Sequence, residues 1–444
     1  MLIIAKPIVT SDPWRNNLSF YGAEKLAHPR NPRQKILANK FMRDLRRIIV
    51  IAVLLLSGCQ HAMPTNGIWG GTVELADAKL LPFRFDLDLR NPTPTGFFLV
   101  GDEPTPIPEI SRQGDALAFR FSEYGAEMSG TWDGRRWKGA YRKFRPGGTT
   151  SLNFTASPEA ANPSDGGSPR VSVPVGKYQV SFADEQRSTT LATFWTTGEA
   201  LYGTFIAPDG DYGLLVGRPA AGSVQLNRFT GWQAMAIVLE QHGETWSGQF
   251  YTQSEKPRRF TLESRTDLEL QTPPNLQTRL KDPAMGFVFE GESLSGTVTR
   301  SSDARFKGRP LVVDIMGTWC HNCMDEAPLL QQLEDRYGSK GLEVVGVSFE
   351  INDDRELAKK NLKLYQERFG LTFTILFAGS IDDANVNSRL RSQLDNFFAY
   401  PTTLFIHKDG KVQAIHSGFK GPGTGTEFQS QVREFHDLAK KLVE

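Results

Sequence analysis

Hydrophobic runs and helical periods alternate along the C-terminal part of the chain. Residues 311–316 are apolar except for Asp314. After them, Leu330, Leu333 and Tyr337 recur at helical spacing. Residues 354–369 have a second helical period, followed by Gly370, a residue type that commonly terminates helices. Strands that alternate with helices predict an α/β sheet covered on both faces.

The other elements expected in this C-terminal region follow the same alternation. They are a β segment at 287–300, strands at 342–349 and 372–377, a polar helical insert at 384–397, and a strand at 400–406 that enters a hairpin turning at 408–410. The final helix is predicted to begin at Thr426, with Gln429 in the capping-box position.

Residues 66–265 show the short apolar–polar alternation of β-strands instead. The run 83–89 alternates strictly, and Asp133-Gly134 and Asp209-Gly210 are typical of hairpin turns. Because no long helical period interrupts this region, we predict that it is all-β.

Two parts of the β region resemble each other at a constant offset. Residues 134–141 match residues 243–250 around Trp137 and Trp246, and residues 67–69 match residues 176–178 at the same spacing. This pattern predicts two repeated β units. The expected boundaries are 60–155 for the first unit, 156–172 for a linker, 173–265 for the second unit, 266–284 for another linker and 285–444 for the α/β domain.

Most of the tryptophans lie in the β units. Aromatic side chains can form platforms for sugars or peptides, but small β units also need them to fill their cores. We favour core packing for this set, which comprises Trp69, Trp132, Trp137, Trp195, Trp232 and Trp246.

The N-terminal region has the pattern of an export signal. The apolar run 48–56 follows three arginines and is well short of the ~20 residues that cross a bilayer. It ends in Leu56-Ser57-Gly58-Cys59, which resembles a bacterial lipobox whose cysteine, Cys59, carries the lipid. We expect translation to begin at Met42, so that 42–59 is a lipoprotein signal peptide and 1–41 is not translated. Gln60 after the lipid-bearing cysteine favours the outer membrane.

Net charge and cysteine content limit the classes of function that the sequence favours. The chain has 51 basic and 50 acidic residues, so its bulk charge does not favour nucleic-acid binding. Cys320 and Cys323 form a Cys-x-x-Cys between a predicted strand and a predicted helix. A helix N-terminus stabilises a thiolate, so we predict a redox-active pair that needs neither a dissociable cofactor nor a metal. The alternative is half a zinc site completed by histidines such as His321 or His416, but such sites usually pair two cysteine motifs.

Several motifs occur together in the order and spacing of a known family. They are Val313-Asp314, Trp319-Cys320-His321-Asn322-Cys323, Glu326-Ala327-Pro328, Tyr400-Pro401-Thr402 and Asp409-Gly410. On these motifs, residues 285–444 resemble the TlpA-type, membrane-anchored thioredoxin-like disulfide reductases. The resemblance implies a thioredoxin fold in which Cys320 attacks the substrate, Cys323 resolves the mixed disulfide, and the two then form a disulfide.

The resemblance also implies roles for neighbouring residues. Pro401 matches the family's cis-proline, which would expose the backbone of Tyr400 to an extended substrate beside Trp319. Asp314 and Glu326 are candidates to take the proton of the resolving thiol, and we favour Glu326.

The dipeptide between the cysteines departs from many relatives, which carry proline beside the second cysteine. We expect His321 and Asn322 to tune the reduction potential, since a protonated His321 would stabilise the thiolate and make the disulfide more oxidising. Asp325 is expected to face solvent.

These observations favour a lipid-anchored thiol–disulfide oxidoreductase that faces the periplasm. It would reduce protein disulfides and be reduced again by a membrane thiol electron donor. The first alternative is a thiol peroxidase, with Thr318 two residues before Cys320. The second is a cell-envelope binding module in which the β units bind the ligand and the redox domain is accessory.

Overall fold

The computed structural model describes residues 66–101, 103–145, 148–159, 172–185, 190–220, 223–253, 256–265 and 277–444. The expected signal peptide, Cys59 and the predicted start at Met42 lie outside these ranges. Among the described residues, no helix combines the length and the apolar character needed to span a bilayer.

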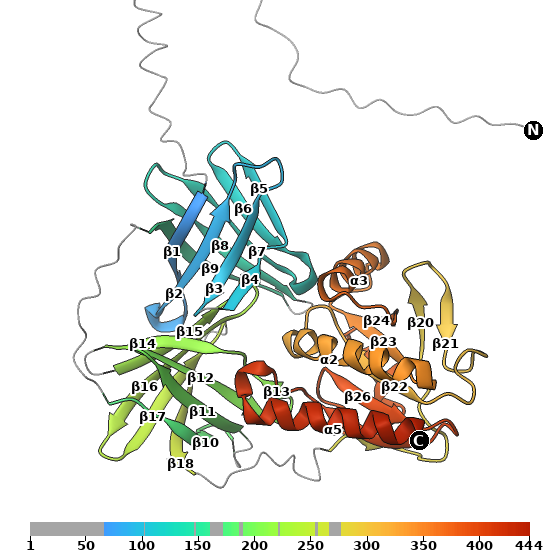
Figure 1. Cartoon of the computed structure of the whole chain (residues 1–444). Coiled ribbons are helices and arrows are strands. Elements are labelled where there is room, and N and C mark those ends of the chain that lie inside the picture. The colour runs from blue at the N-terminus through green and yellow to red at the C-terminus, as the bar shows by residue number, and fades with distance from the viewer. Residues whose placement is uncertain are drawn as a thin grey trace, which may run out of the picture. The chain divides into compact units, whose positions relative to one another are not determined.

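The first sheet contains nine strands in the order β4-β3-β2-β1-β9-β8-β7-β6-β5, and all of its pairings are antiparallel (Figure 1). Short 3-10 turns at Ala76–Ala78 and Ser122–Tyr124 interrupt the meander. The strands are β1 (Asn66–Glu74), β2 (Leu80–Asp88), β3 (Thr95–Val100), β4 (Glu103–Pro106), β5 (Glu109–Gln113), β6 (Ala116–Phe121), β7 (Ala126–Trp132), β8 (Trp137–Arg145) and β9 (Gly148–Pro158).

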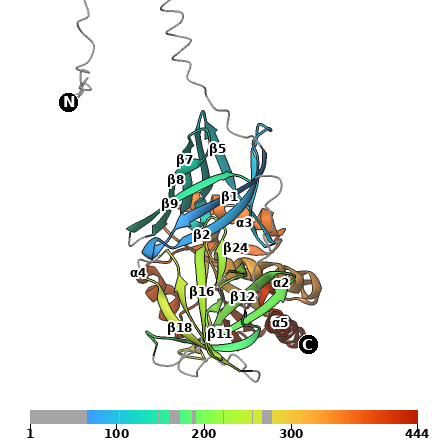
Figure 2. The same ribbon diagram turned by 90° about the vertical axis from the view of Figure 1, so that its left-hand side faces the viewer.

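The second sheet also contains nine strands, in the order β11-β10-β18-β17-β16-β15-β14-β12-β13, with a further pairing of β11 with β12. The view in Figure 2 shows strands of both sheets. The strands are β10 (Gly176–Phe182), β11 (Thr190–Thr197), β12 (Ala200–Ala207), β13 (Gly210–Asp211), β14 (Leu215–Ala220), β15 (Ser223–Phe229), β16 (Ala234–His242), β17 (Thr245–Tyr251) and β18 (Arg258–Ser264).

The prediction of an all-β region is confirmed. β1 and β10 occupy equivalent places, each between the second and the last strand of its sheet, and Trp137 and Trp246 both lie in the penultimate strand. The origin of the two sheets as repeated units stays a prediction. Strand β9 continues to Pro158, so it extends into the segment expected to be a linker.

The C-terminal sheet contains seven strands in the order β21-β20-β24-β23-β22-β26-β27. β22 pairs in parallel with β23 and antiparallel with β26. The strands are β20 (Glu290–Ser293), β21 (Val298–Arg300), β22 (Leu311–Met316), β23 (Glu343–Glu350), β24 (Thr374–Ser380), β26 (Thr402–Ile406) and β27 (Val412–Ser417), and a separate pair joins β19 (Arg279–Leu280) to β25 (Leu394–Asp395).

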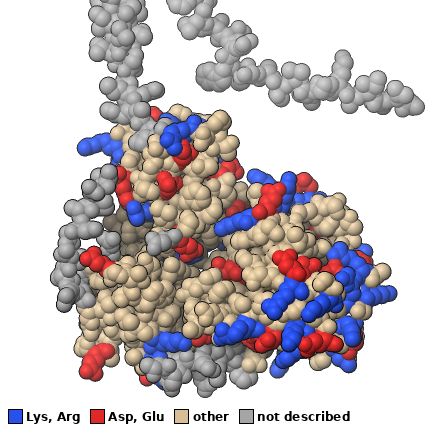
Figure 3. Space-filling view, in the orientation of Figure 1, with Lys and Arg blue, Asp and Glu red and all other residues tan. Residues whose placement is uncertain are grey.

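Helices cover both faces of this sheet. One core cluster joins Val312 and Met316 of β22 to residues of α2, α3 and α5, and a second cluster joins Val313 and Ile315 to Val386 and Leu390. The helical segments are α2 (His321–Tyr337), α3 (Arg355–Phe369), α4 (Asp383–Val386), a π-helical turn at Asn387–Arg391, α5 (Thr426–Val443), and 3-10 turns at Gly338–Lys340 and Pro422–Thr424. In Figure 3, side chains of both charge signs gather over this domain.

The predicted strands and long helices occur close to their expected positions, with three differences. The insert expected at 384–397 is helical only to Arg391, because β25 then pairs with β19. That pairing also places residues 279–280 of the expected second linker in the C-terminal domain. The capping box at Thr426 is wrong: Gly425 precedes the helix, and the hydroxyl of Thr424 accepts the N–H of Phe428 at 3.1 Å.

The tryptophan prediction is confirmed for five of the six side chains. Trp69 and Trp137 are fully buried, and Trp132, Trp232 and Trp246 are at most 8% exposed. Trp195 is partly exposed and stacks on Tyr202. Aromatic burial therefore supplies much of the apolar area that stabilises the two sheets.

The first sheet, the second sheet and α2 share one apolar cluster. Tyr124 of the first sheet stacks on Trp232 of the second, with ring centroids 4.1 Å apart. The Tyr124 hydroxyl also contacts the sulfur of Met324 in α2. The β region is therefore packed against the helix that carries the Cys-x-x-Cys.

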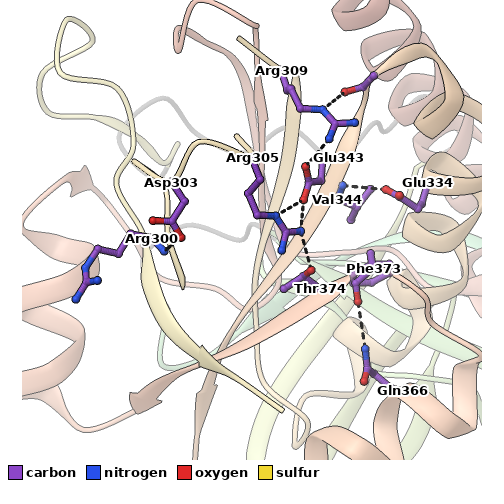
Figure 4. Close-up of polar contacts among 11 residues, drawn as sticks. Arg300, Asp303, Arg305, Arg309, Glu334, Glu343, Val344, Gln366, Phe373 and Thr374 are labelled. Atoms are coloured by element: carbon purple, nitrogen blue, oxygen red, sulfur yellow. Dashed lines mark hydrogen bonds and ion pairs between the residues drawn. The ribbon is translucent and has the colours of Figure 1, made fainter. Parts of the chain in front are cut away.

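A polar cluster fixes the start of β23 in the C-terminal sheet (Figure 4). The Glu343 side chain is 10% exposed, and its carboxylate accepts from Arg305 Nε at 2.9 Å and from Arg309 Nη1 at 3.2 Å. Arg305 also donates to the hydroxyl of Thr374, the first residue of β24, at 2.9 Å. Glu343 and Arg305 together thus tie the segment before β22 to the starts of β23 and β24.

Glu343→Ala should lower the free energy of unfolding by about 1–3 kcal/mol, since it removes charge-assisted hydrogen bonds from a largely buried carboxylate. The matched control is Glu290→Ala, which breaks the exposed Glu290–Arg300 pair and should cost less than about 1 kcal/mol. Urea unfolding followed by tryptophan fluorescence measures both values. Equal losses in the two variants would contradict the role of Glu343.

Candidate active site

Cys320 lies at the N-terminus of α2, where β22 delivers the chain after a short turn. Its Sγ accepts the backbone N–H of Cys323 at 3.2 Å, so the sulfur serves as the N-cap of the helix. The positive end of the helix dipole faces the same atom. Cys320 is 6% exposed and Cys323 is fully buried, so Cys320 is the accessible member of the pair.

The buried position of Cys323 disfavours its ionisation. Burial raises the pKa of this thiol well above its ordinary value, and the hydrogen bond to Cys320 and the charge of Cys320 act in the same direction. The Tyr365 hydroxyl of α3 donates to the Cys323 carbonyl at 2.7 Å, which holds this turn of the helix. The two thiols therefore differ in both access and electrostatic environment.

The turn before Cys320 is held by the end of β23. Glu350 accepts from the Thr318 N–H at 3.1 Å and from the Thr318 hydroxyl at 2.6 Å, and the Trp319 indole donates to the Phe349 carbonyl at 2.8 Å. Burial raises the pKa of Glu350. Sequence reasoning missed Glu350, although an acidic residue at the end of an otherwise apolar strand is a signal that could have identified it.

Tyr400 and Pro401 lie directly beside the sulfur of Cys320. Their peptide bond is cis, as the resemblance implied, and the Cys320 thiol donates to the Tyr400 carbonyl at 3.3 Å. The rings of Trp319 and Tyr400 meet edge to face, with centroids 5.3 Å apart. The structure therefore brings together all the residues expected to position a substrate.

Asp314 and Glu326 form a buried acidic pair beneath the cysteines. Asp314 shares the face of β22 with Val312 and Met316, which is the face covered by α2. Glu326 accepts from the Thr403 hydroxyl at 2.6 Å, whereas Asp314 Oδ1 and Glu326 Oε2 have no hydrogen-bond partner among the described residues.

Both acidic groups hold their protons more strongly than an exposed carboxyl. Burial raises the pKa of Asp314 to about 8. Burial, and then the charge of Asp314, raise the pKa of Glu326 well above its ordinary value. The charge of Asp314 also raises the pKa of the resolving thiol Cys323, whereas Glu326 is influenced by Asp314 and Cys320.

The expectation that Asp325 faces solvent is wrong. Its side chain is only partly exposed, because it lies against the loop around Gly421, where any side chain would collide with the carboxylate. Burial and then the charge of Asp211 raise the pKa of Asp325 to about 8.

His321 and Asn322 contact the second sheet. His321 Nε2 lies 2.7 Å from the Asp211 carbonyl and Nδ1 lies 3.2 Å from Gln233 Nε2, while the Asn322 amide donates to the Asp209 carbonyl at 3.2 Å. The sequence predicted the hairpin at Asp209-Gly210 but gave no sign that it lies on the Cys-x-x-Cys.

The same hairpin is joined to the loop after β27. Gly210 forms a parallel bridge with Phe419, and the Asp211 carboxylate accepts the Gly421 N–H at 2.6 Å and the Gly213 N–H at 2.9 Å. A side chain at Gly210 would collide with the Asn322 amide, so glycine permits this close approach. The second sheet thus covers the dipeptide between the cysteines.

Within the described ranges, no group of three or more His, Cys, Asp or Glu side chains is arranged to hold a metal ion. Both histidines that were considered for a zinc site are engaged elsewhere: His321 with the second sheet, and His416 with Glu434 at 3.0 Å.

Comparison with known proteins agrees with this geometry. The sequence profile of the AhpC/TSA family matches residues 281–415. The thioredoxin-like protein YneN of Bacillus subtilis is 32% identical over 130 residues, which are 29% of this chain and 68% of that protein. The thiol-disulfide oxidoreductase ResA of Geobacillus thermodenitrificans is 34% identical over 130 residues, which are 29% of this chain and 66% of that protein.

Among solved structures, a thioredoxin-family thiol:disulfide interchange protein from Chlorobium tepidum TLS is 21% identical, with a TM-score of 0.27, and the match covers 36% of this chain and 95% of that one. The family profile begins at residue 281, after the last strand of the two β sheets. Through its C-terminal domain, the chain belongs to the thioredoxin-like family and is a thiol–disulfide oxidoreductase.

Proposed function

We propose that the protein is a TlpA-type reductase of protein disulfides that works through a dithiol–disulfide cycle of Cys320 and Cys323. The observation that carries this proposal is the pair of unequal thiols, with one sulfur capping a helix and the other fully buried behind it. The cysteines themselves carry the electrons, so the cycle needs no dissociable cofactor.

In the first step, the Cys320 thiolate attacks one sulfur of a substrate disulfide. The substrate S–S bond breaks, a mixed disulfide forms, and the released substrate thiolate takes a proton from water. Cys323 then passes its proton to Asp314 in its ionised form, which a pKa of about 8 leaves as a minor fraction near neutral pH, and attacks Cys320 Sγ. The second substrate thiolate leaves, and two electrons have moved from the cysteine pair to the substrate.

The return half of the cycle requires an external dithiol. A membrane thiol electron donor would attack the Cys320–Cys323 disulfide and leave oxidised, which restores both thiols. The signal at 42–59 would place the protein on the periplasmic side of the membrane, with a lipid on Cys59 and preferentially in the outer membrane.

The two alternatives receive less support. A peroxidase would be expected to direct a threonine hydroxyl toward its reactive cysteine, but the Thr318 hydroxyl donates to Glu350. A binding module with an accessory redox domain would leave the β units separate from the motif, yet the second sheet bonds directly to His321 and Asn322.

Trapping tests the proposed cycle. Cys323→Ala should accumulate mixed disulfides through Cys320 in cells, because the buried attacking sulfur is missing. The matched control is the double variant Cys320→Ala, Cys323→Ala, which should trap none. Non-reducing gels and mass spectrometry detect the partners, and equal trapping by both variants would refute Cys320 as the nucleophile.

The acidic pair predicts a pH dependence of stability. Between the ordinary pKa of an aspartate and about 8, native Asp314 keeps its proton while the unfolded chain loses it, so wild-type stability should fall as pH rises. Asp314→Asn should remove a slope of up to about 1.4 kcal/mol per pH unit in this window. Unfolding titrations from pH 4 to 9 measure the slope.

The matched control for Asp314→Asn is Glu367→Gln, which changes an exposed carboxyl of α3 and should run parallel to wild type. A wild-type slope retained by Asp314→Asn would show that Asp314 ionises normally in the folded protein.

The lipid anchor predicts a change in fractionation. Cys59→Ser should abolish incorporation of labelled fatty acid and move the protein out of the membrane fraction, because the lipidated sulfur is lost. Metabolic labelling and fractionation measure both effects, and full labelling of Cys59→Ser would exclude Cys59 as the site.

A further inference from the structure

The second sheet contributes three buried residues to the surroundings of the cysteine pair. Asp211 of β13, Arg228 of β15 and Gln233, which precedes β16, are 2%, 5% and 7% exposed. All three belong to the hydrogen-bond chain that ends on His321, the residue between the cysteines. Neither the matched family region nor the cysteine cycle accounts for them.

The direction of each hydrogen bond in this chain is fixed by its partner. Arg228 Nε can only donate, and it lies 2.8 Å from the Gln233 side-chain oxygen. The Gln233 amide nitrogen therefore faces His321 Nδ1 at 3.2 Å, and an amide nitrogen can only donate. The Asp211 carbonyl, 2.7 Å from Nε2, can only accept.

These directions leave His321 one state. Nδ1 must carry a lone pair to accept from Gln233, and Nε2 must carry the proton to donate to Asp211. The imidazole is therefore neutral. A protonated ring would direct an N–H from Nδ1 at the N–H of Gln233.

The surrounding charges act in both directions. Burial lowers the pKa of His321 and the charge of Arg228 adds to this effect, whereas Asp211 and Glu103 oppose it. Asp325, on the same helix, faces Asp211 and Arg228 and is neutral at pH 7, since its pKa is about 8. Burial is the largest of these effects, so it reinforces the state that the hydrogen bonds select.

Arg228 is itself held firmly. Its guanidinium donates to the Leu214 carbonyl at 3.0 Å and pairs with Glu103 at 3.5 Å. Gly213, at φ +77°, leaves room for the guanidinium, which a side chain there would strike. The orientation of the Gln233 amide is therefore determined by a fixed donor on its far side.

We propose that Gln233 and Arg228 are positioning residues of the redox reaction, which hold His321 neutral with its proton on Nε2 and thereby keep the Cys320–Cys323 pair reducing. A cationic imidazole between the cysteines would stabilise the Cys320 thiolate, hence the reduced form, and make the disulfide a stronger oxidant. The expected tuning role of His321 would thus be carried by its neutral ring, since the hydrogen bonds disfavour the protonated form. This inference rests on the proposed dithiol–disulfide cycle.

The test replaces the amide of Gln233, which donates a hydrogen bond to His321 Nδ1, with a group that accepts one. In Gln233→Glu, a carboxylate would accept from both Arg228 and a protonated Nδ1, so His321 should become cationic near pH 6. We expect the glutathione equilibrium of the Cys320–Cys323 pair to shift toward the dithiol by about tenfold at pH 6, which corresponds to about 30 mV. The shift should shrink as pH rises and the imidazole loses its charge.

Two controls separate this effect from a structural one. Gln241→Glu places the same charge at an exposed position in β16, eight residues further along the chain and about 25 Å away along the strand, and should leave the equilibrium unchanged. The second control repeats Gln233→Glu in a His321→Gln background, where the pH-dependent shift should vanish. Gln233→Met, which removes the donor without adding charge, replaces Gln233→Glu if that variant does not fold.

The outcomes distinguish the inference from the proposed function. An equal shift with and without His321, or an unchanged equilibrium in both Gln233→Glu and Gln233→Met, overturns the inference. If wild type forms no Cys320–Cys323 disulfide at any glutathione ratio, the proposed cycle fails instead. In that case, NMR of the intact protein with labelled histidine still decides whether Gln233→Glu raises the pKa of His321.

Discussion

The hydrogen bond from the Cys323 N–H to the sulfur of Cys320 is the interaction on which the rest of the structure depends. It makes a reactive atom the cap of a 17-residue helix, so that the sulfur and the helix N-terminus stabilise each other. The neighbouring contacts preserve this geometry. Glu350 holds the preceding turn, and the Tyr400 carbonyl accepts a hydrogen bond from the Cys320 thiol. Tyr365 secures the backbone behind Cys323.

The interior next to the cysteines is apolar, in contrast to the polar N-terminus of α2. Asp314 and Glu326 are buried among apolar residues, where charge is costly, so both carboxyls keep their protons to a higher pH than an exposed carboxyl does. The proposed neutral state of His321 would likewise leave the other side of the Cys320–Cys323 pair without a charge. The site therefore surrounds Cys320 Sγ, its more accessible sulfur, with buried groups that resist acquiring charge.

The sequence predicted the site where the chemistry is local and missed what depends on packing between distant segments. The strand 311–316, the helix after it and Gly370 follow from periodicity and conformational preference, and they were found. The start of α5 at Thr426 was also found, but its capping box was not, because the hydroxyl of Thr424, before Gly425, accepts the helix N–H in place of Thr426. Gln233 and Arg228 lie some ninety residues before His321, and no periodic or spacing signal connects them.

The close approach of Gly210 to Asn322 affects how a substrate can reach Cys320 Sγ. The chain's own hairpin covers Asn322, two residues after Cys320, whereas Trp319 and Tyr400 beside Cys320 are partly exposed. This arrangement favours the approach of a polypeptide from the side of these two aromatic residues. Access from one side would select substrates by their shape. A disulfide on a narrow, protruding loop would reach Cys320, whereas a disulfide within a broad, flat surface would be blocked by the residues around the site.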